Sequence, residues 1–346
     1  MPKKIKIAML VDCYGGSFIG GGQIHTKYLT QELQKQGCEV IIFSQKNDSL
    51  WQRFWWSVWA VPVLFLKIKD FNIIHAQGHS MGPPAWILAK LWKKPVVLTV
   101  HGSHLLDLKQ KGLQAWLEKL FLLYIPYDLI ITVSPNFLDY KNLSKKTVVI
   151  SNGVVVKENI SKIADSGKIK LLFVGRLVEQ KGVVYLIKAL DQLSKKFDNW
   201  ELEIVGEGPE MEKAKHLVQS YQLDSKIKFL GRIIGEKLSE IYQKAQVFVL
   251  PSLAEGQPIT LLEAWSHKLV AVVSRVGANP SMIKHGQNGL LIKAKNSSDL
   301  AEKLTWLLTH NQKIKEIGQA GYEQVSKYYQ WPQIAEKTLA EYKKLV

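Results

Sequence analysis

Two glutamates, Glu255 and Glu263, stand eight residues apart where an apolar strand-like run ends and a helix is expected to begin. Pro258 between them suits a first helical turn, so the backbone amides of Ile259 and Thr260 should be free at a helix N-terminus. Free amides at such a terminus bind anions. The spacing therefore predicts an anion seat flanked by two acids, with Glu255 before the helix and Glu263 inside it.

This arrangement suits a nucleotide sugar. Its phosphates would bind the amides, and the hydroxyls of its ribose and of its transferred sugar would bind the two carboxylates. A plainer alternative is that Glu255 is a solvated loop acid and that Glu263 is a charge on a helix surface. Other motifs along the chain favour the first interpretation.

Two cations follow another strand-like run. Gly175, Arg176 and Lys181 lie in a short stretch between this strand and the next helix. An arginine forks onto phosphate oxygens and a lysine supplies a point charge, so together they can neutralise a leaving diphosphate. The alternative is a surface ion pair with Glu179.

Loops in the first half of the chain could supply further groups. Gly20, Gly21 and Gly22 precede a helix, and a loop without Cβ atoms lets the backbone approach a diphosphate. Their spacing is not the dinucleotide fingerprint, which disfavours a nicotinamide cofactor. His101 and His104 end a strand-like run, where His101 could hydrogen-bond a sugar or stabilise positive charge. A purely structural role stays open for both loops.

Metal-binding patterns are missing from the sequence. No Asp-x-Asp pair occurs, and no set of histidines and carboxylates has metal-ligand spacing. We therefore expect no metal site and no cofactor, so that cations and amides of the protein assist the departing diphosphate.

Length and composition indicate an ordinary globular chain. At 346 residues it should form two domains, and 47% apolar with 22% charged residues is typical of soluble proteins. Cys13 and Cys38 are too few for a disulfide framework or a thiolate metal site, which favours a reducing cytosol. Residues 1–12 lack the features of a signal peptide, so we expect the chain to stay inside the cell.

The chain carries a net charge of +16. Residues 1–152 are the more basic half per residue, with 18 Lys and Arg against 9 Asp and Glu. Such an excess attracts nucleic acid, anionic lipid or a phosphorylated substrate. No nucleic-acid-binding signature or long basic arm is present, so nucleic acid is not expected as a partner.

Apolar runs of strand length alternate with helical patterns along the whole chain. Continuous Val and Ile runs suit strands covered on both faces, which predicts two open α/β domains with doubly wound parallel sheets. Ligands bind at the carboxyl ends of strands in such sheets. The predicted strands are Ile5–Val11, Val40–Phe43, Ile73–Ala76, Val96–Val100, Asp128–Val133, Val148–Ile150, Leu171–Val174, Leu202–Val205, Ile227–Leu230, Val247–Leu250 and Val270–Val273. The predicted helices lie near 22–36, 51–66, 83–93, 113–125, 135–141, 183–196, 209–221, 236–244, 258–267 and 298–328.

In this order, the motifs resemble those of glycosyltransferase family 4, which comprises retaining nucleotide-sugar glycosyltransferases of the GT-B architecture. That architecture has two Rossmann-like domains facing across a cleft. The resemblance covers nearly the whole chain and rests on Gly20–Gly22, His101-Gly102, Ser151-Asn152-Gly153-Val154, Gly175-Arg176-Leu177, Lys181-Gly182, Val205-Gly-Glu-Gly-Pro209 and the pair Glu255 and Glu263. It implies an acceptor-side domain (1–151), a nucleotide-sugar-binding domain (152–330) and a terminal helix (331–346) that returns to the first domain.

The resemblance also implies roles for single residues. Arg176 and Lys181 would hold the diphosphate beside Gly175, and the donor would be a UDP- or GDP-sugar. Glu255 would meet the donor sugar and Glu263 the ribose. Gly21 and Gly22 would approach the phosphates, and His101 would line the sugar site. The implied reaction is hexosyl transfer with retention at the anomeric carbon.

Two stretches depart from the family pattern. Members often have Gly-Gly-x-Pro-Glu after the last strand, where this chain reads Gly277-Ala278-Asn279-Pro280-Ser281 and loses the acid. The helix after Glu263 contains Trp265 and His267 instead of the usual small residues and glycine. Both departures leave the donor sugar and the local packing open.

Residues 50–66 are unusually apolar for a surface helix. They hold four of the eleven tryptophans and a single charge, Arg53, and Lys67 and Lys69 follow. Pro62 and the short length argue against a membrane span, whereas Trp and basic residues favour the membrane interface. We expect peripheral attachment to the inner leaflet and a lipid, lipid-linked or glycan acceptor. The alternative is a helix buried against the sheet or in a dimer contact.

Two other functions remain compatible with the sequence. One is a basic adaptor without catalysis that binds a membrane or nucleic acid. The other is an epimerase or phosphorylase with the GT-B architecture, although epimerase chemistry needs further acid and base groups that we do not identify. The oligomeric state is left open.

Overall fold

The computed structural model describes residues 4–14, 20–45, 50–102, 113–139, 146–157 and 167–346. The chain divides into two compact units: unit 1 consists of Met1–Gly153 and Trp331–Val346, and unit 2 of Val154–Gln330. The division falls after Gly153 rather than after Ser151.

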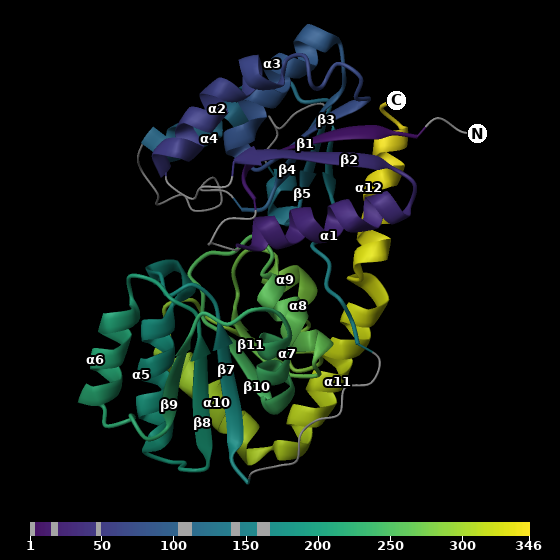
Figure 1. Ribbon diagram of the computed structural model, residues 1–346. Helices are drawn as coiled ribbons and strands as arrows, with labels where there is room; N and C mark the ends of the chain where they lie inside the picture. The colour runs from purple at the N-terminus through teal and green to yellow at the C-terminus, as the bar shows by residue number, and fades with distance from the viewer. Residues whose placement is uncertain (1–3, 15–19, 46–49, 103–112, 140–145, 158–166) are drawn as a thin grey trace. The chain divides into compact units, whose positions relative to one another are not determined.

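Unit 1 is built on a six-stranded parallel sheet with the strand order β2-β1-β3-β4-β5-β6 (Figure 1). Its strands are β1 (Lys6–Cys13), β2 (Glu39–Gln45), β3 (Ile73–Gln77), β4 (Val96–Val100), β5 (Leu129–Thr132) and β6 (Thr147–Val149). Its helices are α1 (Gly21–Lys35), α2 (Leu50–Leu64), α3 (Gly82–Trp92), α4 (Leu113–Tyr124) and α12 (Trp331–Lys343), with the 3₁₀ turns η1 (His79–Met81) and η3 (Pro135–Asp139).

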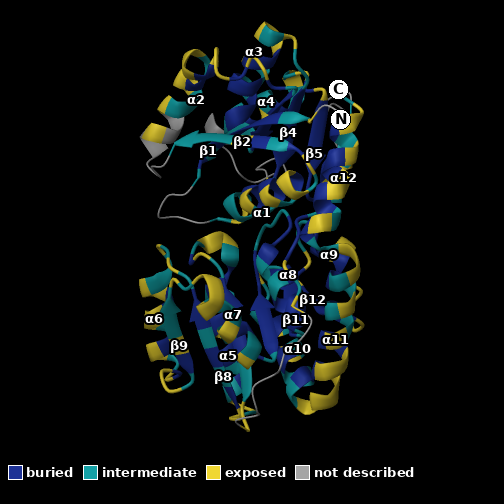
Figure 2. Ribbon diagram, turned by 45° about the vertical axis from the view of Figure 1, so that its right-hand side comes forward, coloured by how far each residue is buried: buried dark blue, intermediate teal, exposed yellow. Residues whose placement is uncertain are grey.

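The continuous apolar strands of unit 1 are explained by helices on both faces of the sheet. Successive strand side chains point to opposite faces. Ile7 and Met9 of β1 therefore join the core that lies under α1 and α12, whereas Ala8 and Leu10 join the core under α2, α3 and α4. The central strands β1, β3, β4 and β5 are mostly buried between these layers, whereas the edge strand β2 is mostly intermediate (Figure 2).

The terminal helix α12 belongs to the core of unit 1. Trp331 and Ile334 are buried with Leu33 of α1, and the Trp331 ring stacks on Tyr28 with centroids 5.6 Å apart. A Cβ at Gly153 would overlap the Trp331 ring, so the glycine of the Ser-Asn-Gly motif makes room for this side chain. The return of the terminal helix to the first unit is as the resemblance implied.

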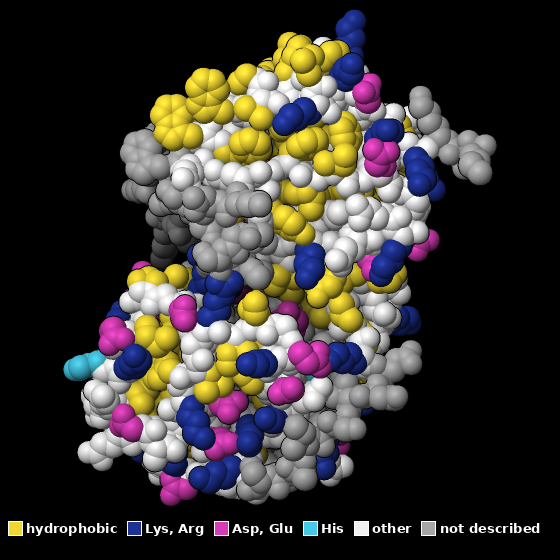
Figure 3. Space-filling view, in the orientation of Figure 1, with side chains coloured by type: hydrophobic (Ala, Val, Ile, Leu, Met, Phe, Trp, Pro, Cys, Tyr) yellow, Lys and Arg dark blue, Asp and Glu magenta, His cyan; other side chains and the backbone are white. Residues whose placement is uncertain are grey.

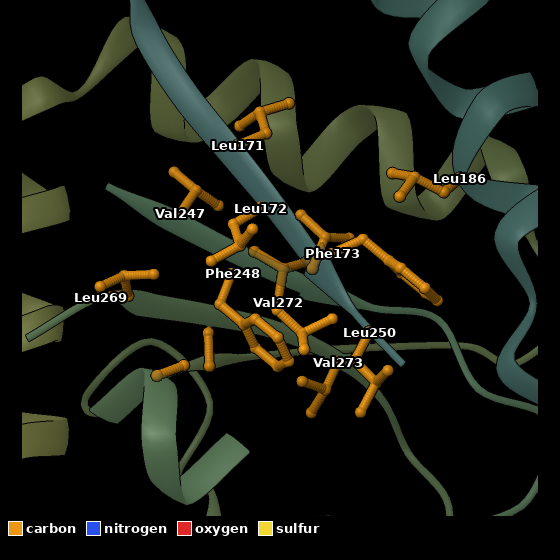
Figure 4. Packing of buried hydrophobic residues seen from close by; sticks show 14 of the residues in the cluster. Leu171, Leu172, Phe173, Leu186, Val247, Phe248, Leu250, Leu269, Val272 and Val273 are labelled. Atoms are coloured by element: carbon orange, nitrogen blue, oxygen red, sulfur yellow. The ribbon is translucent and has the colours of Figure 1, made fainter. Parts of the chain in front are cut away.

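Unit 2 repeats the plan with the strand order β12-β11-β10-β7-β8-β9, again wholly parallel. Its strands are β7 (Ile169–Val174), β8 (Trp200–Val205), β9 (Ile227–Gly231), β10 (Val247–Leu250), β11 (Val270–Ser274) and β12 (Leu290–Ile292). Its helices are α5 (Val183–Ser194), α6 (Met211–Ser220), α7 (Gly235–Lys244), α8 (Ile259–Ser266), α9 (Asn279–Met282), α10 (Ser297–Thr309) and α11 (Asn311–Tyr328), with the 3₁₀ turn η4 (Glu179–Lys181). Figure 4 shows the interleaved side chains of β7, β10 and β11 in its core.

Three sequence predictions of local structure were wrong. The helix predicted over 298–328 is two helices, because His310 adopts a non-helical conformation and its ring Nδ1 lies 2.9 Å from the carbonyl oxygen of Trp306. Side chains that bond a nearby backbone group in this way compete with the helix. Of the predicted helix 135–141, the described residues Pro135–Asp139 form the short 3₁₀ turn η3. The strand β12 was missed because three apolar residues carry no periodicity.

None of the helices in the described ranges is long and apolar enough to cross a membrane.

Candidate active site

The structure brings Lys181 and Glu255 together in unit 2. They follow β7 and β10, which are adjacent parallel strands, so their loops leave the same edge of the sheet. Lys181 Nζ lies 2.6 Å from Glu255 Oε1, and Ser252 Oγ donates to the same oxygen at 2.6 Å. The Glu255 side chain is only 7% exposed and that of Lys181 is 19% exposed, which makes their ion pair part of a shielded site.

Glycine at position 182 allows this pairing. Gly182 has φ +71°, and a Cβ there would overlap the carbonyl oxygen of Pro251. The turn carrying Lys181 can therefore rest directly on the loop after β10. The backbone hydrogen bond from Leu253 N to Gln180 O, 2.7 Å long, joins the two loops beside the pair.

A second glycine holds the other side of the Glu255 loop. Gly277 has φ +55°, and its missing Cβ would overlap the Glu255 carbonyl oxygen. Ala278 N donates to Gly256 O at 2.8 Å. The loop after β11 thus supports the position of Glu255, although Ser281 replaces the acid that is usual there.

Arg176 lies exposed at the same edge of the sheet. Its backbone is held by the loop after β8, where Gly206 and Gly208 have φ values of +140° and +154°. A Cβ at either glycine would overlap a carbonyl oxygen of the stretch Gly175 to Leu177. The backbone of the Gly-Glu-Gly-Pro motif therefore packs closely against that of the Gly-Arg-Leu motif and holds its position.

Glu263 on α8 is half-buried and bonded to α7. The Tyr242 hydroxyl donates to Glu263 Oε2 at 2.9 Å. Burial raises the pKa of the Glu263 carboxyl to about 7, while the bond from Tyr242 partly offsets this rise. Near neutral pH the carboxyl can therefore accept or donate a hydrogen bond.

The helix α8 begins at Ile259, directly after Pro258, and no side chain caps its N-terminus. The amides of Ile259 and Thr260 lie in its first turn, where helices leave their N–H groups without intrahelical partners. The predicted anion seat and both predicted acids are thus on one connected segment of unit 2.

In unit 1, the structure brings Gly22 and His101 together. A Cβ at Gly22 would stand 3.3 Å from Cδ2 of His101, so the glycine lets α1 approach the imidazole. His101 Nε2 lies 2.8 Å from Gln77 Oε1 and donates to it, because a carboxamide oxygen only accepts. Its Nδ1 is therefore the acceptor, and this buried atom has no partner among the described residues.

A second histidine supports the first. The His25 and His101 rings meet edge to face with centroids 4.6 Å apart, and His25 Nδ1 lies 2.9 Å from Asn152 Oδ1. Burial lowers the pKa of His25 to about 4. Burial, followed by the neighbouring imidazoles, holds the pKa of His101 well below its usual range. Both rings are therefore neutral at physiological pH.

Two family models together match most of the chain. The model described as Glycosyl transferases group 1 matches residues 156–324, and that of Glycosyltransferase Family 4 matches residues 19–158. The chain therefore belongs to the glycosyltransferases of the group 1 and family 4 type.

Relatives and solved structures agree with this assignment. An uncharacterised glycosyltransferase of Methanocaldococcus jannaschii is 29% identical over 341 residues, which cover 91% of this chain and 92% of the relative. The Escherichia coli UDP-Gal:alpha-D-GlcNAc-diphosphoundecaprenol alpha-1,3-galactosyltransferase is 30% identical over 256 residues, covering 66% and 64%. Sucrose-phosphate synthase from Thermosynechococcus elongatus shares the fold with a TM-score of 0.86, at 22% identity over 99% of both chains. Anabaena HepE, solved with UDP-glucose, has a TM-score of 0.80 at 16% identity over 98% and 100%. The predicted GT-B architecture is confirmed.

The sequence did not indicate the bonding roles of several residues that position the motifs of this glycosyltransferase. Ser252 and Tyr242 bond the two acids, and Gln77 and Asn152 bond the two histidines. Asn152 was part of the Ser-Asn-Gly motif, but nothing in the motif indicated its partner. The other three are polar residues near a strand end or a tyrosine on an amphipathic helix, which are signals that many loops and helices share.

Some expectations lie outside what the structure describes. His104 falls in the undescribed range 103–112.

Among the described residues, no group of three or more His, Cys, Asp or Glu side chains is placed to hold a metal ion.

Proposed function

We propose that this glycosyltransferase moves a hexose from a UDP- or GDP-sugar to a lipid-linked acceptor, with retention at the anomeric carbon and without a metal ion. The observation that carries the proposal is the shielded pair of Lys181 and Glu255 beside the uncapped start of α8. A cation, a carboxylate and helix N-terminal amides are the groups that a sugar diphosphate requires, so this arrangement supports the proposal.

The diphosphate would bind to Lys181, Arg176 and the amides of Ile259 and Thr260. Gly175 would give its backbone room, and Gly21 and Gly22 of unit 1 are proposed to approach the phosphates. As the bond between sugar and phosphate breaks, negative charge grows on the leaving diphosphate, and fixed cations stabilise that charge. The solved complex of HepE with UDP-glucose supports a nucleotide-sugar donor.

Glu255 would recognise a hydroxyl of the transferred sugar. Its Oε1 already accepts from Lys181 and from Ser252, so Oε2 is the oxygen left for the sugar. A carboxylate neutralised by an ammonium group and a hydroxyl is a weak nucleophile, which favours same-face substitution over a covalent intermediate. In that reaction the departing phosphate would take the proton of the acceptor hydroxyl.

Glu263 would bind the ribose, and His101 would line the sugar site. The position of Glu263 is held by Tyr242, and that of His101 by Gln77. Because His101 is neutral and presents its Nδ1 lone pair, it suits a hydroxyl donor better than an anion.

The metal-independent part of the proposal rests on sequence and charge. The chain has no Asp-x-Asp pair, and Arg176 and Lys181 offer two positive charges for the diphosphate.

The acceptor class is supported by the names of relatives, one acting on a diphosphoundecaprenol and another described as a phosphatidylinositol N-acetylglucosaminyltransferase subunit from Saccharomyces cerevisiae. We accordingly propose a cytoplasmic protein that is peripheral on the inner face of the cell membrane.

Ligand-induced thermal stabilisation tests the donor. UDP-, GDP- and ADP-sugars and their free diphosphates are added without metal to the wild type, to Arg176→Ala and to Lys188→Ala, an exposed control on α5. A ligand that binds only the folded state stabilises it by about 2.7 kcal/mol at a hundred times its dissociation constant. We expect one base series to raise the melting temperature of the wild type and the control but not of Arg176→Ala. If no nucleotide raises it, the adaptor function is favoured.

The stereochemistry and the metal requirement are tested on the product. With the donor identified, NMR of the new glycosidic bond should show the anomeric configuration of the donor, and turnover should persist in EDTA. An inverted product or a complete loss in EDTA that added Mg²⁺ restores would contradict those parts of the proposal.

A further inference from the structure

The helix α2 has two unlike faces. On its inner face, Ala60 and Leu64 are fully buried, and Trp56 Nε1 donates to the carbonyl oxygen of Val11 at 3.1 Å. Its outer face carries large apolar side chains at helical spacing, with exposed fractions of 50% for Val58, 56% for Trp59, 45% for Val63 and 69% for Leu66 just past the helix end. The helix is therefore packed on the sheet and still presents an apolar stripe to the outside.

The neighbouring helix α3 widens this stripe. Trp92 Nε1 donates to the carbonyl oxygen of Phe65 at 2.7 Å, and the two rings meet with centroids 4.9 Å apart. This contact joins the end of α2 to the end of α3. We call the combined surface the α2–α3 apolar face; it consists of Trp55, Val58, Trp59, Val63, Leu66, Ile87 and Leu91, all exposed. Figure 3 shows hydrophobic side chains gathered over these two helices.

Lysines surround the α2–α3 apolar face. Residues 55–70 and 82–94 contain five lysines and one acid, Asp70. Lys67 and Lys69 directly follow α2, and Lys90 and Lys93 lie at the end of α3, all four of them exposed. Exposed tryptophan with lysine at its edge is the composition that prefers the boundary between headgroups and acyl chains. Each lysine near an anionic leaflet adds attraction.

The charge on this surface argues against a second copy of the chain as its occupant. A twofold contact between identical patches would bring lysine edges of like charge together. An anionic bilayer instead offers negative headgroups to the lysines and an apolar layer to Trp59 and Leu66 in a single contact.

We propose that the α2–α3 apolar face docks on an anionic lipid bilayer, with α2 lying in the plane of the interface. This docking narrows the membrane attachment in the proposed function from the segment 50–66 to one face of two helices. It rests on that function for its biological purpose only, because lipid binding through this face needs neither donor nor acceptor.

Vesicle co-sedimentation tests the docking. The wild type should bind vesicles that contain phosphatidylglycerol more tightly than vesicles of phosphatidylcholine alone, and added salt should weaken the binding. Trp59→Ser with Leu66→Ser should lower the partition coefficient by at least about tenfold, because two large apolar side chains no longer enter the lipid. Lys67→Gln with Lys69→Gln should lower it by about fivefold for each lysine on anionic vesicles only.

The matched control is Tyr328→Ser on α11, which removes a 50% exposed aromatic side chain outside the α2–α3 apolar face. It should bind vesicles as the wild type does. All variants change exposed residues, so unchanged melting temperatures will show that they fold. Unchanged nucleotide-induced stabilisation will separate loss of docking from loss of the transfer site.

Two results would overturn the docking. The first is that the wild type does not bind anionic vesicles, or that it binds them and both double variants bind them equally well. The other is a dimer in lipid-free solution that Trp59→Ser with Leu66→Ser converts to a monomer, which would make the surface a contact between copies of the chain.

Discussion

Lys181 and Glu255 form an ion pair across two neighbouring loops, 2.6 Å from Nζ to Oε1, although 74 residues separate them in the chain. The pair exists because β7 and β10 are adjacent in the sheet and because glycine occupies position 182. It neutralises the carboxylate and fixes the ammonium group before any donor binds.

The variant Glu255→Gln should separate chemistry from nucleotide binding. It keeps a polar side chain beside Ser252 but removes the charge that faces Lys181. We expect turnover at saturating donor to fall by about 100-fold, the scale seen when one preorganised polar contact is lost. Affinity for the free nucleoside diphosphate should be kept or improved, because Lys181 is released for the phosphates. Steady-state kinetics and calorimetry measure the two quantities.

A matched control for this prediction is Glu210→Gln, which removes a carboxylate paired with Lys213 on the surface of unit 2. It should leave turnover unchanged. Full turnover of Glu255→Gln would remove Glu255 from the proposed site.

The raised pKa of Glu263, about 7, gives unit 2 a stability that depends on pH. In the unfolded chain a glutamate loses its proton near pH 4.3, while the folded protein retains it to about pH 7. The folded state therefore binds more protons between these values, and this carboxyl's contribution to stability declines by about 3 kcal/mol as the pH rises through that window. Glu263→Gln should abolish this part of the decline in melting temperature, whereas exposed Glu240→Gln on α7 should not. Parallel pH profiles for wild type and Glu263→Gln would refute the assignment.

The buried histidines of unit 1 give the opposite dependence. Burial lowers the pKa of His25 to about 4 and of His75 to about 3. An unfolded histidine is protonated below about pH 6.5 while the folded rings stay neutral, so stability falls as the pH drops from that value towards the folded pKa. His25 alone should contribute about 3 kcal/mol to this loss. In an NMR titration we expect the rings of His25 and His75 to be neutral at pH 5. A protonated His25 at pH 5 would contradict this expectation.

Gly277→Ala should damage the site beyond the strain of its backbone. Its φ of +55° costs about 1–2 kcal/mol for a residue with a Cβ, and the new Cβ would also displace the Glu255 carbonyl oxygen. Gly286→Ala is the control, since Gly286 has φ +80° and no atom within 4 Å of its added Cβ. We expect similar backbone strain in both variants but a fall in turnover of about tenfold or more only in Gly277→Ala. Equal turnover in the two would show that the contact does not position Glu255.

The bulky side chain of Trp265 fits because the residue that faces it on helix α11, Gly321, is a glycine. A Cβ at Gly321 of α11 would overlap the Trp265 ring, whereas a Cβ at Gly318 would overlap the backbone of Lys268. Gly321→Ala should destabilise unit 2 by about 1–3 kcal/mol, and Trp265→Leu should recover part of that loss. The same leucine should not rescue Gly318→Ala. Thermal unfolding of the singles and both doubles measures the coupling, and additive effects at Gly321 would refute the contact.

The sequence predicted the two parallel sheets well because both faces of each sheet are covered. Runs such as Val247–Leu250 are apolar at every position, and a short run of this kind is typical of a strand that is buried on both faces. Breaks inside helical patterns were harder to predict. His310 ends α10 through its own ring, which leaves the apolar periodicity on either side intact.

The site was predictable in its residue types but not in its pairings. Glu255 and Lys181 were each assigned to strand ends, yet their direct contact depends on β7 lying beside β10, which chain order does not reveal. Asn152 bonds a histidine 127 residues away, and nothing in the spacing of either residue indicates this. Partners of this kind become visible only when the fold is known.

The membership of α12 in unit 1 has a consequence for the order of folding on the ribosome. Trp331 and Ile334 complete a core that begins with Ile7, yet they are synthesised after the whole of unit 2. Domains made during translation generally fold as they emerge, the first one first. Here the second unit can close its core while the first still waits with an open apolar surface, which makes the nascent first unit a natural client for chaperones.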